Sequence, residues 1–385
     1  MTERDTKWIT AALALSTAST GPQIVALSLL MPEITTALNA TVPQLGQLNT
    51  AFSVVAIIGS IAMGAITLRY PPKRLLVTGI TALLAGIIGT SLSTGFTQMV
   101  LFFVLYGVGT SLTLPIVSLL LTLYPLDQRT TALGRIYSGR SLTSILATPV
   151  IGFIAALYGW RAGYIGFGAP LILLAVIMVS AKVPEQQTPG GDVDLMSGFR
   201  KVASNRSALA CLTGAALSLA FFNSLMVFNG TYMRNNLGLS LETASLAMSV
   251  TFIAVAVGQV LSGAFADRIG IKNTTWLSTL IGGISLFLYF SVRLPVPLAI
   301  LASAIGTGMA GTTMTTMATL ALEQVPDSRG TMMSLNSAAM NTGGMLSTVI
   351  GGVAISSLGF TGYGAIMLTI SLVAAITFYA WTTES

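Results

Sequence analysis

Charged side chains are rare in this sequence, so the few that lie near apolar runs have the most potential for chemistry. Only 8% of the 385 residues are charged, there is no His, and Cys211 is the single cysteine. Without a His, a Cys pair, a phosphate-cradling loop or a buried carboxylate pair, no catalytic constellation or metal site is predicted. We expect a protein that is not an enzyme and needs no cofactor, with an intramembrane hydrolase as the remote alternative.

Arg140 stands inside an apolar run, about Thr131–Tyr158, at four to five residues from its middle. That offset is roughly 7 Å at ~1.5 Å per residue. An arginine near the centre of a membrane costs about 2.5–3.5 kcal/mol on insertion scales, so it needs a partner or water. Two interpretations stay open. The guanidinium binds an anionic or carbonyl group of a substrate, or it snorkels to the cytoplasmic face along its aliphatic stem.

The apolar runs themselves are long enough to cross a membrane. Hydrophobic residues make up 53% of the chain, and about 20 apolar residues span a bilayer. Two charge-free intervals, Leu75–Leu126 and Gly330–Thr383, have room for two spans each, with turns near Ser93–Gln98 and Ser357–Gly364. The run from Trp8, about Trp8–Met31, is too long for a signal peptide. The prediction is an all-α membrane protein of twelve transmembrane helices.

The basic residues are distributed unevenly between the predicted loops. The sequence has 18 Lys and Arg. Three of them, Arg161, Arg234 and Arg293, fall in loops on one side of the membrane, and Arg140 lies in a span. The other fourteen lie on the opposite side of the membrane. Cytoplasmic loops carry the excess of basic residues. We therefore expect a multi-pass plasma-membrane protein with both termini cytoplasmic. The net charge of +6 then reflects orientation in the lipid bilayer, and no nucleic acid is expected as a partner.

The chain divides near its middle and repeats. Lys182–Arg206 is the only long polar segment and reads as a cytoplasmic linker. It separates a six-helix bundle at 1–181 from a second at 207–385. Polar and glycine positions of the two halves match at an offset near 200 residues. The pairs are Gly64 with Gly263, Arg69 with Arg268, Lys73 with Lys272, Arg129 with Arg329, and Gly152 with Gly352. A repeat of six helices indicates a transporter with two halves that rock.

A charged turn, Gly263-Ala-Phe-Ala-Asp267-Arg268-Ile-Gly270-Ile-Lys272, lies between two apolar runs. Gly263 is expected to let another helix come close. Asp267 is expected to act as a latch on the positive N-terminal end of a helix near Thr130–Thr131. Leu68 stands at the equivalent position of the first half, so the first half has no acidic residue that could form a second latch.

This turn resembles the cytoplasmic signature of the major facilitator superfamily, Gly-x-x-x-Asp-Arg-x-Gly-x-Lys. Pro326–Asn336 resembles a stretch of its drug and metabolite efflux branch, which includes arabinose-efflux-like permeases. Ala147–Gly152, with Pro149, is similar to that branch's antiporter motif, although Thr148 replaces a glycine. Phe103 falls where the family's helix-4 motif has Arg. The resemblance covers essentially the whole chain and implies alternating access, with helices 1, 4, 7 and 10 lining the cavity.

The candidate substrate contacts lie on those cavity-lining helices, with Arg140 added. Amides supply donors and acceptors without fixed charge, and methionines and aromatics adapt to ligand shape. The set is Gln23, Tyr106, Arg140, Asn223, Asn229 and Met314. The polar middle of the first helix, Ser16–Gln23, is expected to face a water-filled cavity. The alternative is a packed, kinked helix whose hydroxyls bond back to its own carbonyls. For Met314, packing between helices is an equal alternative.

Two further sets complete the candidate residues. Gating is assigned to Gly263, Asp267, Arg268, Lys272, Arg69, Arg129, Arg329 and Pro149. No acid lies in the central part of a span, so any proton coupling falls to the membrane-edge carboxylates of Glu33, Glu242 and Asp267. Glu33 is expected just past the outer end of the first helix. Glu242 has an alternative, because an acid in a first turn suits the helix dipole.

The function expected from these features is export of small organic solutes by a monomeric secondary active transporter, with protons as a candidate coupling partner. A facilitator or importer of sugars, nucleosides or similar metabolites is the alternative, favoured by the missing buried carboxylates. A membrane receptor that does not transport is a third interpretation. The sequence does not name the substrate.

Overall fold

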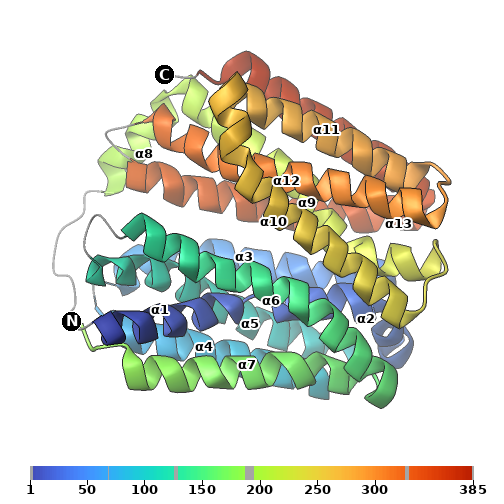
Figure 1. Ribbon diagram of the computed structural model, residues 1–385, viewed down its shortest axis with the longest axis horizontal. Coiled ribbons are helices and arrows are strands. Elements are labelled where there is room, and N and C mark those ends of the chain that lie inside the picture. Colours follow the sequence, from blue (N-terminus) through green and yellow to red (C-terminus); the bar gives the residue numbers. More distant parts are fainter. Residues whose placement is uncertain (1–2, 68, 125–128, 187–194, 326–328, 384–385) are drawn as a thin grey trace. The chain divides into compact units, whose positions relative to one another are not determined.

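The computed structural model describes residues 3–67, 69–124, 129–186, 195–325 and 329–383, and every regular element in these ranges is a helix (Figure 1). The elements are α1 Glu3–Ala18, α2 Pro22–Leu38, α3 Val42–Ile66, α4 Pro72–Leu92, α5 Phe96–Leu119, η1 Leu120–Leu123, α6 Arg129–Tyr158, α7 Trp160–Lys182, α8 Leu195–Ser204, α9 Arg206–Asn235, α10 Leu241–Ile269, α11 Ile271–Ser291, α12 Val296–Gln324 and α13 Arg329–Trp381.

The predicted count of twelve spans is confirmed for the described part of the chain. Nine segments there are long and apolar enough to cross a membrane, α1 and α2 together forming one of them. α3 and α6 add two long helices of 25 and 30 residues. α13 contains two spans, because 53 residues would reach about 80 Å as one helix. Gly359 interrupts it with a positive φ of 67°, inside the predicted turn.

The first span is two helices rather than one. Sequence placed a single helix at about Trp8–Met31, but α1 ends at Ala18 and α2 begins at Pro22. Pro22 lacks a backbone N–H and is suited to the first helical position. α2 then continues to Leu38, so Glu33 lies within the helix, partly exposed, and the prediction that it lies past the end was wrong.

Contacts divide the chain into two compact units. Unit 1 comprises residues 1–191 with 239–249, and unit 2 comprises residues 192–238 with 250–385. The boundary falls inside Lys182–Arg206, which also contains α8. The first turns of α10, assigned by sequence to the second bundle, group with unit 1, where Ser249 donates a hydrogen bond to the Ile145 carbonyl of α6 over 3.2 Å.

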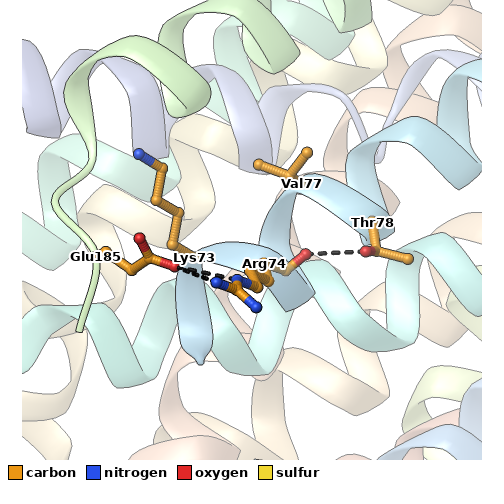
Figure 2. A pocket seen from close by; sticks show the side chains of 5 residues that line it. All are labelled: Lys73, Arg74, Val77, Thr78 and Glu185. Atoms are coloured by element: carbon orange, nitrogen blue, oxygen red, sulfur yellow. Dashed lines mark hydrogen bonds and ion pairs between the residues drawn. The ribbon is translucent and has the colours of Figure 1, made fainter. Parts of the chain in front are cut away.

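In unit 1, α4 packs against both α5 and α7, and α1 packs against α6 and α7. The approach of α1 and α6 is close at Gly139, where an added Cβ would lie 3.0 Å from the Ala14 carbonyl oxygen. An ion pair joins the start of α4 to the segment after α7, with 3.0 Å between Arg74 and Glu185 (Figure 2). Both side chains are exposed, so the pair contributes little to stability.

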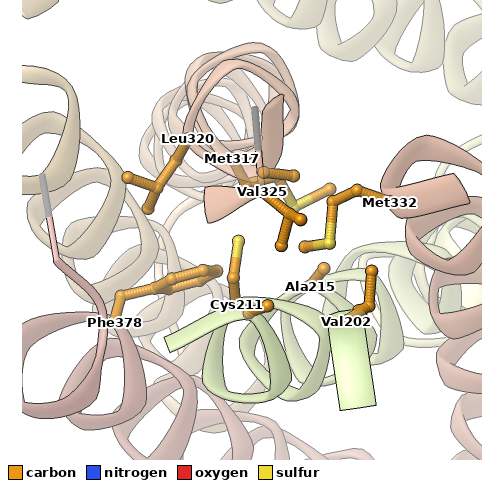
Figure 3. Close-up of a cluster of buried hydrophobic side chains, with 10 residues drawn as sticks. Val202, Cys211, Ala215, Met317, Leu320, Val325, Met332 and Phe378 are labelled. Carbon is orange, nitrogen blue, oxygen red and sulfur yellow. The ribbon is translucent and has the colours of Figure 1, made fainter. Parts of the chain in front are cut away.

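In unit 2, α13 packs against α9 and α11, and α11 packs against α12. The core at one end of these helices is wholly apolar and includes Cys211 of α9 and Phe378 of α13 (Figure 3). Val202 of α8 is fully buried in the same cluster, so α8 is anchored to the unit by its apolar face. α10 and α12 also touch closely, since a Cβ on Gly258 would lie 1.9 Å from the Gly308 carbonyl oxygen.

Candidate functional site

In unit 1 the candidate site begins at Gln23, in the first turn of α2. Its Nε2 donates to the hydroxyl of Thr90 on α4 over 3.0 Å, and Thr90 itself donates to the Gly86 carbonyl over 2.8 Å. The Thr90 hydroxyl can therefore only accept from Gln23, which fixes the orientation of the amide. Gln23 is fully buried, and its Oε1 has no partner among the described residues. The first turn of α2 thus presents an unsatisfied acceptor.

Two tyrosines support the break between α1 and α2. The Tyr106 hydroxyl of α5 donates to the Ser19 carbonyl over 2.7 Å, and the Tyr164 hydroxyl of α7 donates to the Gln23 carbonyl over 3.2 Å. A helix break inside a membrane frees carbonyls that need such donors. Tyr106, expected to contact substrate, therefore holds the backbone next to Gln23. Sequence reasoning missed Tyr164, although a tyrosine within an apolar run was a signal.

The hydroxyls before Gln23 favour the alternative of a packed, kinked first span. Ser16 donates to the Ala12 carbonyl, Ser19 to Leu15 and Thr20 to Thr17, over 2.7 to 2.8 Å. All three serine and threonine side chains are buried. Because these hydroxyls are satisfied by the helix itself, the expectation that they face water is corrected, and only the Gln23 Oε1 remains open.

Arg140 lies on α6, directly after the close contact of Gly139 with α1. Its side chain is half-buried, and its charge lies near enough to the buried Tyr106 hydroxyl to act on it electrostatically. The guanidinium makes no hydrogen bond or ion pair with another residue that the structure describes. A cation in a span with no counterion among the described residues is equipped to bind an anion.

In unit 2 a buried amide also lies on the first span, Asn229 of α9, six residues beyond the repeat counterpart of Gln23. The Tyr289 hydroxyl of α11 donates to its Oδ1 over 2.7 Å, and the Tyr232 hydroxyl donates to the Tyr289 carbonyl over 2.7 Å. Asn229 is 1% exposed, and its Nδ2 has no partner among the described residues. The middle of α9 thus presents an unsatisfied amide donor at Asn229. Tyr289, which sequence reasoning did not select, orients the amide.

The other predicted contacts have less specific surroundings. Asn223 lies on α9 and is partly buried. Met314 lies on α12, partly buried against the apolar core that holds Cys211. Its placement agrees with the packing alternative.

The predicted gating residues do not form one cluster within the described parts of the units. Asp267 and Arg268 are exposed on the last turn of α10, and Arg69 is exposed before α4. No described atom of its own unit lies within 4 Å of a Cβ built on Gly263, so unit 2 by itself forms no close helix contact there. Lys272 has its Nζ 5.9 Å from the centre of the Tyr379 ring.

The remaining gating and coupling residues are placed as follows. Pro149 lies inside α6, partly buried. Glu242 is exposed in the first turn of α10, which Ser240 caps by accepting the Thr243 N–H over 3.3 Å. Arg129 and Arg329 begin α6 and α13. Their side chains lie outside the described ones, as do Leu68 and the side chains of Thr130 and Thr131, where the latch was predicted.

Twelve spans in two units, each with a buried amide on its first span, define a polytopic membrane protein with polar groups inside its helical core. The Major Facilitator Superfamily model matches residues 12–230 and 210–385. The chain therefore belongs to the major facilitator superfamily. It is a multi-pass secondary transporter of small solutes and not an enzyme.

Individual relatives are distant. The chain is 26% identical over 271 residues to a cis,cis-muconate transport protein of Acinetobacter baylyi, a match that covers 66% of this chain and 64% of that protein. It is 23% identical over 309 residues to a hexuronate transporter of Bacillus subtilis, covering 77% and 70%. A crystal structure of a D-xylose-proton symporter superposes with a TM-score of 0.82 at 16% identity, covering 98% of both chains.

Proposed function

We propose that the protein carries small organic carboxylates across the membrane by alternating access. The observation that carries the proposal is Arg140, a cation inside a spanning helix with no counterion among the described residues. A guanidinium offers a planar fork of donors that matches a carboxylate. The names of both relatives support this substrate class, since muconate is a dicarboxylate and a hexuronate is a sugar acid.

The two unsatisfied amides extend the proposal to specificity. The Asn229 Nδ2 is a donor and suits a carboxylate or carbonyl oxygen, whereas the Gln23 Oε1 is an acceptor and suits a hydroxyl or N–H group. Buried polar groups without partners cost free energy, which a ligand that satisfies them recovers.

For direction, export remains our proposal, based on the antiporter-like Ala147–Gly152 stretch and Pro326–Asn336. Uptake without proton coupling is the alternative that the missing central carboxylates favour. Proteoliposomes with an imposed pH gradient distinguish them: export predicts proton-driven uphill flux, and a facilitator predicts counterflow alone. If Glu33→Gln, Glu242→Gln and Asp267→Asn all keep full uphill flux, coupling through these carboxylates is wrong.

We also propose that both termini and the Lys182–Arg206 segment are cytoplasmic, from the fourteen-to-three split of basic residues. In a variant with Cys211 replaced, single cysteines at Gln187 and Asn236 test this. An impermeant thiol reagent on intact cells should label Asn236→Cys alone. Labelling of Gln187→Cys alone would invert the topology.

The test of substrate class is a binding and counterflow assay on Arg140 variants, with muconate, a hexuronate and the neutral sugar xylose as probes. Arg140→Gln should abolish carboxylate binding while the protein still inserts and folds, and Arg140→Lys should rescue it partly because the fork is lost. Carboxylate binding and flux at the original level in Arg140→Gln would remove Arg140 from the site and leave the snorkelling interpretation. Equal transport of xylose would contradict the anionic class.

A further inference from the structure

A cleft opens on the surface of unit 2 between two spanning helices, α11 and α13. Its volume is about 200 Å³, and it is lined by Trp276, Leu280, Leu372, Ala375, Ile376 and Tyr379. Almost the whole lining is apolar. Several of these side chains are well exposed, including Ile376 at 55% and Tyr379 at 61%. Because both helices are membrane spans, the medium that fills this cleft is the lipid layer.

The cleft has a polar end. Trp276 and Tyr379 meet edge to face with 5.4 Å between ring centres, and the Lys272 Nζ lies 5.9 Å from the Tyr379 ring centre. Lys272 is the second residue of α11, and Tyr379 stands two residues before the end of α13. The aromatic pair and the lysine are therefore at the membrane–water interface, where Trp and Tyr rings are stable.

The other end of the cleft points into the bilayer. Leu372 precedes Tyr379 by seven residues, about 10 Å along α13 at ~1.5 Å per residue. From the interface inward, the cleft is therefore lined first by the cation of Lys272, then by the rings of Trp276 and Tyr379, and then by aliphatic side chains. This is the order of groups in a phospholipid, with its phosphate, glycerol esters and acyl chain.

We propose that this cleft binds one phospholipid with an anionic headgroup, its acyl chain between α11 and α13 and its phosphate at Lys272. The apolar channel alone would accept any acyl chain. The charge at its interfacial end selects against a headgroup with no net charge, because each basic residue near an anionic membrane surface contributes attraction. The proposal does not depend on the transported substrate.

The test uses Trp276 as a reporter. Trp8, Trp160 and Trp381 are replaced by Phe, and the protein is reconstituted with lipids whose acyl chains carry bromine, which quenches a tryptophan in contact. Brominated phosphatidylglycerol in unlabelled phosphatidylcholine is compared with the reverse mixture at equal mole fraction. The ratio of the two quenching curves gives relative affinity at that one position and does not depend on bromine depth.

A matched control moves the reporter to an open surface of the same unit. Trp276→Phe with Val260→Trp places the tryptophan on α10, where Val260 is 80% exposed. We expect phosphatidylglycerol to be preferred about fivefold at Trp276, with a ratio near unity at the control position and at Trp276 after Lys272→Gln. The proposal is wrong if the two lipids bind equally well at Trp276, or if phosphatidylglycerol is preferred equally at Trp276 and at the control position. It is also wrong if the preference at Trp276 remains after Lys272→Gln.

Discussion

Gln23 and Asn229 are buried amides on the first spans of their units, but they leave opposite groups without a partner. Each amide lies on the first span of its unit and bonds to a hydroxyl of the third, Thr90 in one case and Tyr289 in the other. Gln23 uses its donor and keeps an acceptor open, whereas Asn229 uses its acceptor and keeps a donor open. The two buried amides therefore differ in the polarity of the group that they leave open.

The largest effect is expected at the open donor. Asn229→Leu should lower carboxylate affinity by about 10- to 100-fold, because hydrogen bonds to charged groups contribute about 1.5–3 kcal/mol. Isothermal titration or a substrate-dependent shift of the melting temperature measures it. Tyr289→Phe is the matched control, since it removes the same internal hydrogen bond and leaves the Nδ2 in place. If Tyr289→Phe weakens binding as much, Asn229 only supports the fold.

The second prediction compares how the two units tie their helix ends together. In unit 1 a hydrogen bond of 2.8 Å joins Thr10 to Tyr124. In unit 2 the Gln324 side chain accepts from Ser207 of α9 and donates to the Thr383 carbonyl over 3.0 Å. Gln324→Leu should reduce the free energy of unfolding by about 1–3 kcal/mol, because it removes two hydrogen bonds of about 0.5–1.5 kcal/mol each.

Tyr124→Phe should cost less, about 0.5–1.5 kcal/mol, the contribution of one ordinary hydrogen bond. Denaturant titration in detergent micelles measures both variants. An equal loss in the two would show that the unit 2 network adds nothing beyond a single bond.

The open acceptor should give a smaller and more selective effect. Gln23→Leu should weaken binding of a hexuronate by about 2- to 10-fold, the range for a neutral hydrogen bond. Muconate has no hydroxyl, so its affinity should not change. Thr90→Val keeps the Gln23 Oε1 and serves as the control. A parallel loss for both acids would show that Gln23 does not sense hydroxyl groups.

The smallest expected effect concerns the charged turns. Asp267→Asn should shift the population toward the inward-open state by about 0.3–1 kcal/mol, the contribution of an exposed carboxylate to a helix dipole, and slow transport accordingly. Distance distributions between spin labels on the two units measure the shift. Leu68→Asp supplies an acidic residue at the equivalent position of the first half, so it should shift the population away from the inward-open state. Unchanged distributions in both variants would exclude the latch.

The sequence predicted the spans and their turns well because these follow from local chemistry. The turn near Ser93–Gln98 separates α4 from α5, and the turn at Ser357–Gly364 contains the break at Gly359. Hydropathy cannot show where a span breaks, so it joined α1 to α2 and placed Glu33 outside the helix. It also cannot show which hydroxyls are already satisfied. For Ser16 and Thr20 the acceptor lies in the same helix, which only coordinates reveal.

For the candidate site, the sequence indicated which residue types to select but not which contacts those residues make. Gln23 and Asn229 were selected as amides in spans, and both have unsatisfied atoms. Tyr106 was selected as an aromatic that adapts to ligand shape, but its hydroxyl donates to the Ser19 carbonyl. Tyr164 and Tyr289 were missed because the hydrogen-bond partner of a tyrosine depends on tertiary packing, which the sequence pattern does not show.

The buried position of Cys211 makes the native chain its own reporter of unfolding. The thiol is fully buried in the apolar core beside Phe378, and it is the only cysteine in the sequence. A maleimide dye can reach it only when α8, α9, α12 and α13 separate. The rate of its modification on heating therefore measures the opening of unit 2 alone, without engineered labels and without a contribution from unit 1.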